Sequence, residues 1–527
     1  MDSEDRTPLL GEPADEQAPA TISRRRFVLR TLGWFASVGV ASAVGYEWPR
    51  PQVAASPASN GALEAVRDFV SRPDLHPPRI RFTITTAGLE VLGREALQGG
   101  DQPRYIFVSP RTTGEDPSQP GLMVLDRQGR LIWFEPKLTS SPFDMNVQTY
   151  QGQPHLTWWE GDVVHGHGEG VAKIANESYR EVNTIRAGHG LQVDLHELRL
   201  TNAGTALITA YENTTADLTS VGGAKGGALL AGHVQEIDLA TGEVLFDWNS
   251  IEHVGVDESY QKAPTKATIA YDYFHINSIA EDFDGNLLVG ARNTWAVYKI
   301  HRQTGEVMWR MNGKRSDFSM GPGAAFYWQH DTTMPEPSLM SVFDDGGYPN
   351  EEKQSRALLL HVDTQAMTVT LKKAFEHPAG FVAANQGNVE LLADGRVFVG
   401  WGNQPYFTEF AADGTLLFDG EFPSPVRSYR AYTHQWEGTP LEAPSVAARS
   451  NNAGGSIVYA SWNGSTEVRH WMVRAGKERS ALAPVGSQEW TGFETAIAVN
   501  TPGRYFSVTA LDKDQKELAT SAIVEIA

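Results

Sequence analysis

Three histidines occupy equivalent positions in successive repeats of this sequence, and an arginine accompanies one of them. His275 lies in the segment DYFHINSIAEDFDGNLLVGAR, and His330 follows it by 55 residues, which is one repeat period. His196 precedes the hairpin glycine of a third copy of the same pattern. Arg292 ends the second strand of the His275 hairpin, so strand pairing should bring it back beside His275. Asn277 lies two residues after His275, on the same strand face.

This set of side chains suits chemistry on an anion. Three imidazoles alone would suit zinc, but a neighbouring arginine favours an anionic group over a metal ion. A neutral imidazole can attack a sulfur or phosphorus centre, while the other histidines and the arginine hold oxygens and take up charge in the transition state. The sequence has no P-loop and no glycine-rich nucleotide fingerprint. We therefore expect a simple ester as donor and not a nucleotide.

The elements that must position these residues are short strands in a repeated four-strand unit. One half of the unit is a small-turn hairpin, as in residues 284–294 and 394–404. The other half is a strand, a turn and a strand with an aromatic residue, as in 296–311 and 407–422. A four-stranded unit with a period near 50 residues is typical of a propeller blade. We predict an all-β chain with a six-bladed β-propeller over residues 105–440, whose innermost strands bring the three histidines together at the mouth of a central channel.

The regions on either side of the repeats differ from them. Residues 441–527 alternate as short strands, which predicts a β-sandwich of the immunoglobulin or fibronectin III kind with Trp462 in its core. Residues 56–104 form a lead-in segment, with a helix expected at 61–70 and a strand at 79–86.

Residues 1–55 have the features of an export signal. The stretch SRRRFVL matches the twin-arginine pattern, and the apolar segment that follows is short and diluted with Gly, Ala and Ser. Two interpretations stay open, a cleaved signal and a membrane anchor at residues 27–46. Both predict export by the twin-arginine route to an extracellular or cell-surface location, with membrane association only through this N-terminal segment.

Composition excludes several classes of function. The chain has 527 residues, of which 41% are apolar, with a formal charge of −20. Such an acidic chain repels phosphate backbones, so nucleic acid is not expected as a partner. The chain contains no cysteine. This excludes disulfides, thiolate metal sites, iron–sulfur clusters and a cysteine nucleophile.

The repeat region resembles the arylsulfate sulfotransferase family of exported six-bladed propellers, which need no phosphoadenosine donor. The resemblance is carried by DYFHINSIAEDFDGNLLVGAR, by YWQHD followed by FDDG, and by DLHEL followed by GTALITAYEN. It implies that His330 is the nucleophile and forms a sulfohistidine, assisted by His275 and His196. Arg292 and Asn277 would bind the sulfuryl oxygens. It also implies ping-pong transfer from a small aryl sulfate to a phenolic acceptor, with no cofactor and no metal.

Aromatic side chains flank the predicted site. Trp295, Tyr327 and Trp328 could stack on an aryl ring, and we take Trp295 and Tyr327 as candidate substrate-binding residues.

Three alternatives remain at this point. His165, His167 and Glu169 in VVHGHGEG could ligate a metal, although the nearby glycines favour a tight loop at the channel rim. The TGEVLFDW and TGEVMW repeats also resemble those of quinoprotein dehydrogenases, which would make the chain an oxidoreductase. A non-catalytic, exported binding scaffold is the third possibility.

Overall fold

The structure is a computed structural model, and it does not describe every part of the chain. The described residues are 67–97, 104–112, 116–347, 349–451, 454–501 and 503–526. The twin-arginine signal and the anchor segment 27–46 therefore lie outside the described residues, as does most of the helix expected at 61–70, whose last residues, 67–70, are not helical. Within the described ranges, none of the helices is long and apolar enough to cross a membrane.

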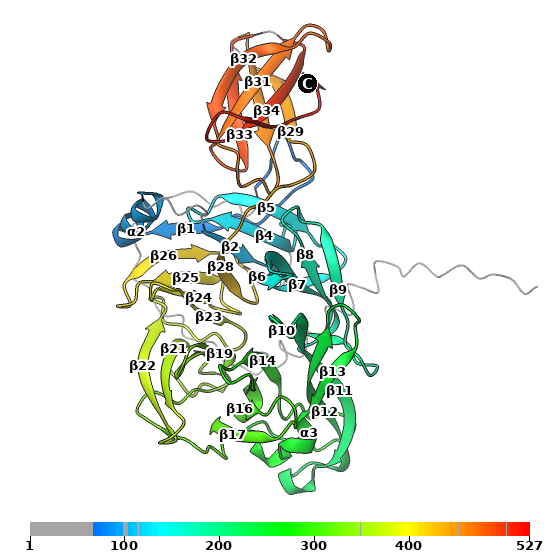
Figure 1. The fold of residues 1–527 in the computed structure, drawn as a ribbon, viewed down its shortest axis with the longest axis vertical. Helices are drawn as coiled ribbons and strands as arrows, with labels where there is room; N and C mark the ends of the chain where they lie inside the picture. The colour runs from blue at the N-terminus through cyan, green and yellow to red at the C-terminus, as the bar shows by residue number, and fades with distance from the viewer. Residues whose placement is uncertain are drawn as a thin grey trace, which may run out of the picture. The chain divides into compact units, whose positions relative to one another are not determined.

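The chain is all-β and propeller-like, because consecutive strands pair in antiparallel sheets around a common centre (Figure 1). One sheet runs in the order β28 (Ala431–Gln435), β2 (Arg104–Val108), β4 (Gly121–Asp126), β5 (Leu131–Pro136). The next sheet contains β6 (Ser141–Tyr150), β7 (Gln153–Val164), β8 (His167–Ala175), β9 (Glu181–Ile185), β10 (Val193–Leu200), β11 (Thr205–Asp217), β12 (Lys225–Asp238) and β13 (Val244–Asn249).

Three further sheets follow along the chain. The first is β14 (Ile276–Glu281), β15 (Leu287–Ala291), β16 (Ala296–Ile300) and β17 (Val307–Asn312). The second is β19 (His330–Glu336), β20 (Leu339–Asp344), β21 (Arg356–Asp363) and β22 (Thr368–Glu376), with β18 (Ser319–Met320) at its edge. The third is β23 (Asn388–Leu391), β24 (Val397–Gly400), β25 (Tyr406–Phe410) and β26 (Leu416–Glu421).

The innermost strands form a closed ring. β6, β10, β14, β19, β23 and β28 each contact the next, and β28 contacts β6 again. Closure depends on β28, which comes from the end of the repeat region but pairs with β2 from its beginning. The short strands β3 (Arg111–Thr112) and β27 (Val426–Arg427) join the same two regions a second time. The expected central channel is therefore lined by strands from the whole repeat region.

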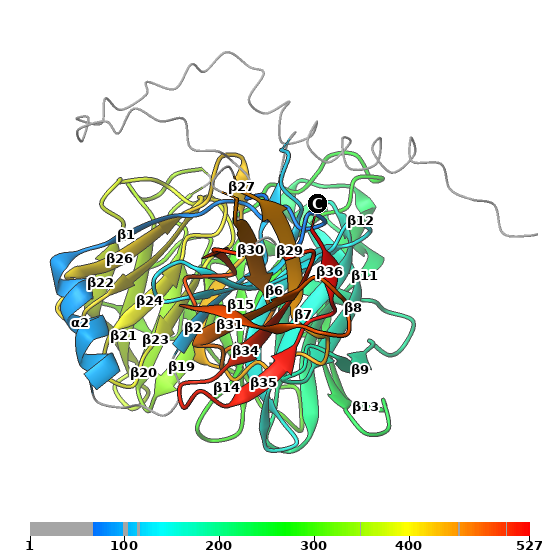
Figure 2. The same cartoon turned by 90° about the horizontal axis from the view of Figure 1, so that it is seen from above.

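The lead-in segment adds to the outer edge of one sheet. Strand β1 (Arg81–Ile84) pairs with β26, and helix α2 (Thr86–Leu97) follows at the same edge (Figure 2). The strand expected at 79–86 is thus present, whereas α2 was not predicted. The remaining helical segments are α3 (Ser250–His253), η1 (Thr219–Val221), η2 (Val256–Glu258) and η3 (Arg292–Thr294).

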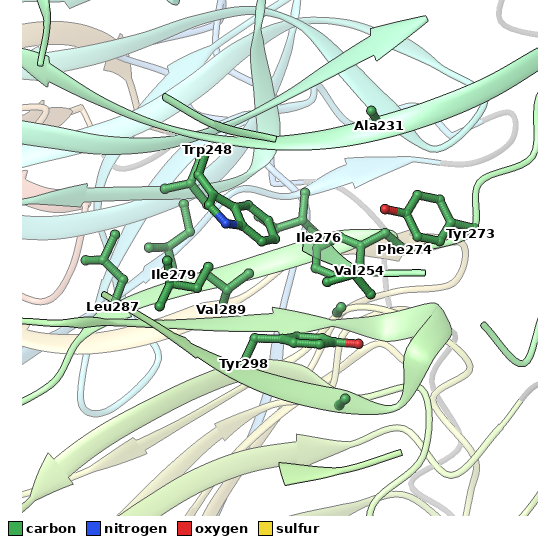
Figure 3. Close-up of a cluster of buried hydrophobic side chains, with 14 of the residues drawn as sticks. Ala231, Trp248, Val254, Tyr273, Phe274, Ile276, Ile279, Leu287, Val289 and Tyr298 are labelled. Atoms are coloured by element: carbon green, nitrogen blue, oxygen red, sulfur yellow. The ribbon is translucent and has the colours of Figure 1, made fainter. Parts of the chain in front are cut away.

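A hydrophobic cluster packs strands β11–β13 against the β14–β17 sheet and fixes the start of β14 (Figure 3). Phe274 and Ile276 are both fully buried in it, and they flank His275. Burying each such side chain contributes roughly 2–3 kcal/mol. The predicted hairpin after β14 is confirmed: the Gly285 N–H donates to the Asp282 carbonyl at 2.9 Å, with Gly285 at a φ of 81°. This packing leaves His275 little freedom to move.

Residues after 440 form two antiparallel sheets around a shared core. One holds β29 (Ser445–Ser450), β30 (Ser456–Ser461) and β33 (Glu494–Val499); the other holds β32 (Ala483–Glu489), β31 (His470–Gly476), β34 (Tyr505–Leu511), β35 (Glu517–Thr520) and β36 (Val524–Glu525). The fully buried tryptophan is Trp471, whereas Trp462 is only partly buried and donates to the Glu442 carbonyl at 2.6 Å. The expectation for Trp462 was therefore wrong, because its indole lies at the margin of this core.

Candidate active site

Each of the three predicted histidines is paired with its own aspartate. In all three pairs a carboxylate oxygen lies within hydrogen-bond distance of the imidazole Nδ1. The pairs are His196–Asp194 at 2.7 Å, His275–Asp272 at 2.5 Å and His330–Asp345 at 2.8 Å. A carboxylate at Nδ1 holds the proton there and leaves the lone pair on Nε2. The site therefore presents three oriented imidazoles.

The three rings lie close together, as the comparison of the repeats predicts. The ring centroids of His196 and His275 are 4.9 Å apart, and those of His196 and His330 are 6.4 Å apart. His196 lies in β10, His275 directly precedes β14, and His330 begins β19. These three strands are neighbours in the inner ring. One small ligand could therefore contact all of them.

Each histidine reaches the cluster in a different way. His196 lies within β10, and its carbonyl accepts a hydrogen bond from the Tyr429 hydroxyl at 3.2 Å. His330 is the first residue of β19. His275 was expected inside a strand but precedes β14, with a left-handed φ of 54°. This conformation is uncommon for a residue other than glycine, and it lets the imidazole turn toward Asp272.

Arg292 lies beside the cluster. Its backbone N–H donates to the His275 carbonyl at 2.9 Å, as the predicted strand pairing requires. Its guanidinium packs over the Trp328 ring at 4.9 Å and donates to the Ala384 carbonyl at 3.0 Å. Burial lowers the pKa of Arg292, although Asp345 and Asp272 act in the opposite direction. The positive charge of Arg292 also helps to lower the pKa of the His330 imidazole.

Burial keeps two of the imidazoles neutral. It lowers the pKa of His275 to about 4, against the attraction of Asp272. It also holds the pKa of His330 well below the ordinary value, with Arg292 as the next contributor. His330 is 1% exposed. A neutral imidazole whose Nδ1 proton is held by Asp345 has its lone pair at Nε2, which is the form that can attack an electrophile.

Asn277 contacts the backbone next to His330. Its side-chain amide donates to the Gln329 carbonyl at 2.6 Å, and its Oδ1 is buried without a hydrogen-bond partner. Gln329 directly precedes His330, and its own amide donates to two carbonyls of the neighbouring sheet. Asn277 thus fixes the backbone that carries His330, with its N–H group directed to that backbone.

The aromatic residues form a cluster on the Arg292 side. The ring of Trp295 stacks on Tyr260, with centroids 3.5 Å apart, and meets Tyr327 and Trp328 edge-on at 5.1 Å each. Because Trp328 also carries the Arg292 guanidinium, this aromatic surface continues directly from the charged part of the site. Trp295 is 9% exposed, while Tyr327 is half-buried and the more accessible of the two.

His167 joins the cluster, although it was weighed only as part of an H-x-H motif. Its ring centroid is 5.3 Å from that of His275, and its Nε2 is 3.3 Å from Asp272 Oδ2. His165 and Glu169 are exposed, so the motif does not bring its members together. Burial opposes a charge on His167, but Asp272 raises its pKa. The Asp272 carboxylate therefore lies close to both His167 and His275.

One group of side chains could hold a metal ion. The ligand atoms of His167, Asp272 and His275 all lie within 4.8 Å of one another. Two imidazoles and a carboxylate form a donor set that binds divalent transition metals. In this structure the Asp272 carboxylate is engaged by the Nδ1 of His275.

Sequence reasoning missed the three aspartates and one backbone contact. Asp194 is held in its charged form: burial acts to raise its pKa, but His196, His167 and hydrogen bonding lower it to about 2. The motifs D-x-H and D-x-x-H, and the aspartate pair of FDDG, were the available signals. The backbone N–H of Gln386 donates to Nε2 of His330 at 3.2 Å.

A buried ionic cluster lies behind the histidines and joins all the inner strands. Its centre is the fully buried Arg430, whose guanidinium contacts Asp144 in β6, Glu197 in β10 and the Asn277 carbonyl in β14. Asp331 in β19 lies 3.8 Å from Arg430 and accepts a hydrogen bond from the backbone of β23.

A cavity of about 210 Å³ lies at the C-terminal ends of β10, β14 and β19. It is lined by Arg199, Leu200, Ala280, Glu281, Thr333, Met334 and Pro335.

Comparison with known proteins was made once this geometry was established. The family model described as Arylsulfotransferase (ASST) matches residues 146–423, which include the four predicted catalytic residues. No curated protein matches the chain at a significant level.

The solved structures that resemble this chain are distant from it. A protein of unknown function from Bacteroides caccae is 12% identical, with 63% of this chain and 98% of that chain covered and a TM-score of 0.39. A protein from Lactobacillus plantarum is 15% identical, with 76% and 100% covered and a TM-score of 0.36. A catalytically inactive virginiamycin B lyase from Staphylococcus aureus with quinupristin is 8% identical, with 73% and 96% covered and a TM-score of 0.33. These likenesses say nothing about the chemistry of the site.

Proposed function

The chain belongs to the arylsulfotransferase (ASST) family, and we propose that it transfers a sulfuryl group from an aryl sulfate to a phenolic acceptor through a sulfohistidine on His330. The observation that carries this proposal is the state of His330. Burial keeps its imidazole neutral, Asp345 holds its Nδ1 at 2.8 Å, and the charge of Arg292 lowers its pKa further. These features support a nitrogen nucleophile directed at an anionic ester.

The proposed reaction has two halves. In the first, Nε2 of His330 attacks sulfur, the N–S bond forms, the bond from sulfur to the aryl oxygen breaks, and a phenolate leaves. Arg292 and the neighbouring imidazoles take up the charge on the sulfuryl oxygens. Asp345 stabilises the positive charge that develops on the imidazole ring.

In the second half, an acceptor phenol takes the place of the departed phenolate. Its oxygen attacks sulfur while its proton passes to the imidazole of His275 or His196, and the N–S bond breaks. His330 returns to its neutral form, and the proton is released to solvent. Trp295 and Tyr327 would hold the aryl ring of either substrate by stacking. This scheme is a ping-pong mechanism that needs no cofactor.

The remaining sequence-based expectations complete the proposal. The ring of inner strands supports a six-bladed propeller over residues 105–440, preceded by the lead-in at 56–104. The two sheets after it support an immunoglobulin-like module at 441–527. We also propose export by the twin-arginine signal in residues 1–55, with 27–46 as a signal or an anchor.

Peptide mass mapping after incubation with p-nitrophenyl sulfate tests the central step. We expect a sulfuryl adduct on the peptide that contains His330, and release of p-nitrophenol that His330→Ala abolishes. His361→Ala, at an exposed histidine on β21, is the matched control and should react like the wild type. Turnover by His330→Ala at the wild-type rate, with no adduct on His330 of the wild type, would rule out this function.

A further inference from the structure

Arginines in the interior of this protein are generally matched by a carboxylate. Removing a guanidinium from water is costly, and an ion pair with good geometry offsets the cost. The matched pairs are Arg127–Glu409 at 2.7 Å, Arg199–Glu197 at 3.0 Å, Arg356–Asp344 at 2.5 Å and Arg430–Glu197 at 3.1 Å.

Arg111 departs from this pattern. Among the ion pairs within the described residues, none includes Arg111. Its guanidinium packs over the Phe143 ring at 4.4 Å, its Nη2 donates to Gln386 Oε1 at 2.8 Å, and its Nε is buried without a hydrogen-bond partner. Its only described polar partner is thus a neutral amide oxygen.

A second positive charge lies next to Arg111. Arg427 is directly opposite it in the β3–β27 ladder. Burial lowers the pKa of Arg111 to about 9, and Arg427 is the next cause. Two arginines at facing positions of paired strands concentrate positive charge in this partly buried place. Such a concentration of positive charge favours an anion.

Gln386, the residue that contacts Arg111, also contacts the proposed nucleophile His330. Gln386 offers its Oε1 to Arg111 and its backbone N–H to Nε2 of His330. Two residues earlier, the Ala384 carbonyl accepts from Arg292. Gln386 has a φ of 71°, which costs on the order of 1 kcal/mol in a residue other than glycine. A strained segment thus supplies both arginines with oxygen atoms.

We propose that Arg111, with Arg427 beside it, is a second anion-binding subsite, and that it receives a carboxylate or sulfate group carried on the aryl ring of the substrate. Gln386 Oε1 occupies the place of that group when no substrate is bound. The inference rests on the proposed function in so far as Arg292 holds the sulfuryl group that reacts. The favoured substrates are then aryl sulfates with a second negative charge.

Binding of unreactive aryl sulfonates tests this proposal without turnover. Their carbon–sulfur bond is not a sulfate ester, so no sulfuryl transfer interferes. We expect 3- or 4-sulfobenzoate to bind the wild-type chain about tenfold more tightly than benzenesulfonate, measured by isothermal titration calorimetry. Arg111→Gln should abolish this advantage and leave benzenesulfonate binding unchanged. Arg449→Gln, at an exposed arginine near the Tyr459 ring, is the matched control and should keep the advantage.

A variant that is expected to bind sulfobenzoate more tightly separates the proposal from a simple loss of folding. Gln386→Gly removes the competing oxygen and suits the left-handed backbone. It should tighten sulfobenzoate binding several-fold, which a damaged protein would not do. The inference is overturned if benzenesulfonate binds but neither dianion binds more tightly, or if the advantage survives in Arg111→Gln. If benzenesulfonate itself does not bind, the sulfuryl site at Arg292 fails, and the proposed function fails with it.

Discussion

The Nδ1 atom of His330 lies 2.8 Å from Oδ2 of Asp345, and the two side chains are 1% and 0% exposed. This pair is buried deeply enough that the imidazole has no alternative partner at Nδ1. Its ring orientation and its tautomer are therefore set by the carboxylate. We therefore expect the reactivity of Nε2 in His330 to depend on the Asp345 carboxylate, on the opposite side of the ring.

Replacing Asp345 by asparagine tests that dependence. An amide can present an N–H group to Nδ1 and so favour the tautomer with its proton on Nε2, which removes the nucleophilic lone pair. We expect kcat for p-nitrophenyl sulfate to fall roughly 10²- to 10⁴-fold. Asp363→Asn, at the last residue of β21, should leave kcat unchanged. Near wild-type kcat in a folded Asp345→Asn variant would show that another group activates the nucleophile.

Arg292→Lys tests the recognition of the sulfuryl oxygens. Lysine keeps the positive charge but loses the planar fork that binds two oxygens at once. We expect a loss of about 2–4 kcal/mol in transition-state binding, measured as kcat/KM. Arg474→Lys, in a surface ion pair with Glu517, is the control and should change kcat/KM little. If Arg292→Lys has wild-type kcat/KM, the anion is bound elsewhere.

His275 should make stability depend on pH between about 4 and 6.5. Burial lowers its folded-state pKa to about 4, whereas its ordinary value is 6.5. Below pH 6.5 His275 binds a proton in the unfolded chain, whereas in the folded chain it stays neutral down to about pH 4. Acid therefore lowers the free energy of unfolding. Relative to His275→Gln, the wild type should lose up to about 3 kcal/mol of unfolding free energy as the pH falls from 6.5 to 4.

Urea unfolding of both proteins at several pH values measures this difference. Above pH 6.5 the difference between the two proteins should be constant. His155→Gln, at a partly buried histidine in β7, should show no such pH-dependent difference from the wild type. A difference that is constant from pH 4 to 8 would mean that His275 is not held neutral by the fold.

The histidine cluster was predictable because repeats superpose. His275 and His330 are separated by one period, so equivalent strands carry them to the same end of the ring. The hairpin from Asp284 to Arg292 was predictable as well, because Asp-Gly between alternating apolar residues specifies a tight turn.

The aspartate partners were not predictable from periodicity. Asp345 is fifteen residues from His330 and reaches it through the β19–β20 pairing, whose register shifts twice. Such bulges insert residues without a regular sequence signal. Asp272 reaches His275 through a left-handed residue outside any strand. Gln386 comes from a different sheet, so only tertiary structure could place its N–H group on His330.

The Arg430 cluster has a consequence for the order of events at the site. It ties together the six inner strands between the histidines and the cavity at their other ends. We infer that this buried ionic cluster closes the inner end of the site, so that both phenols pass through the opening on the histidine side. Under the proposed function, the spent phenol leaves before the acceptor enters, and the sulfuryl group stays bound to His330 in the interval.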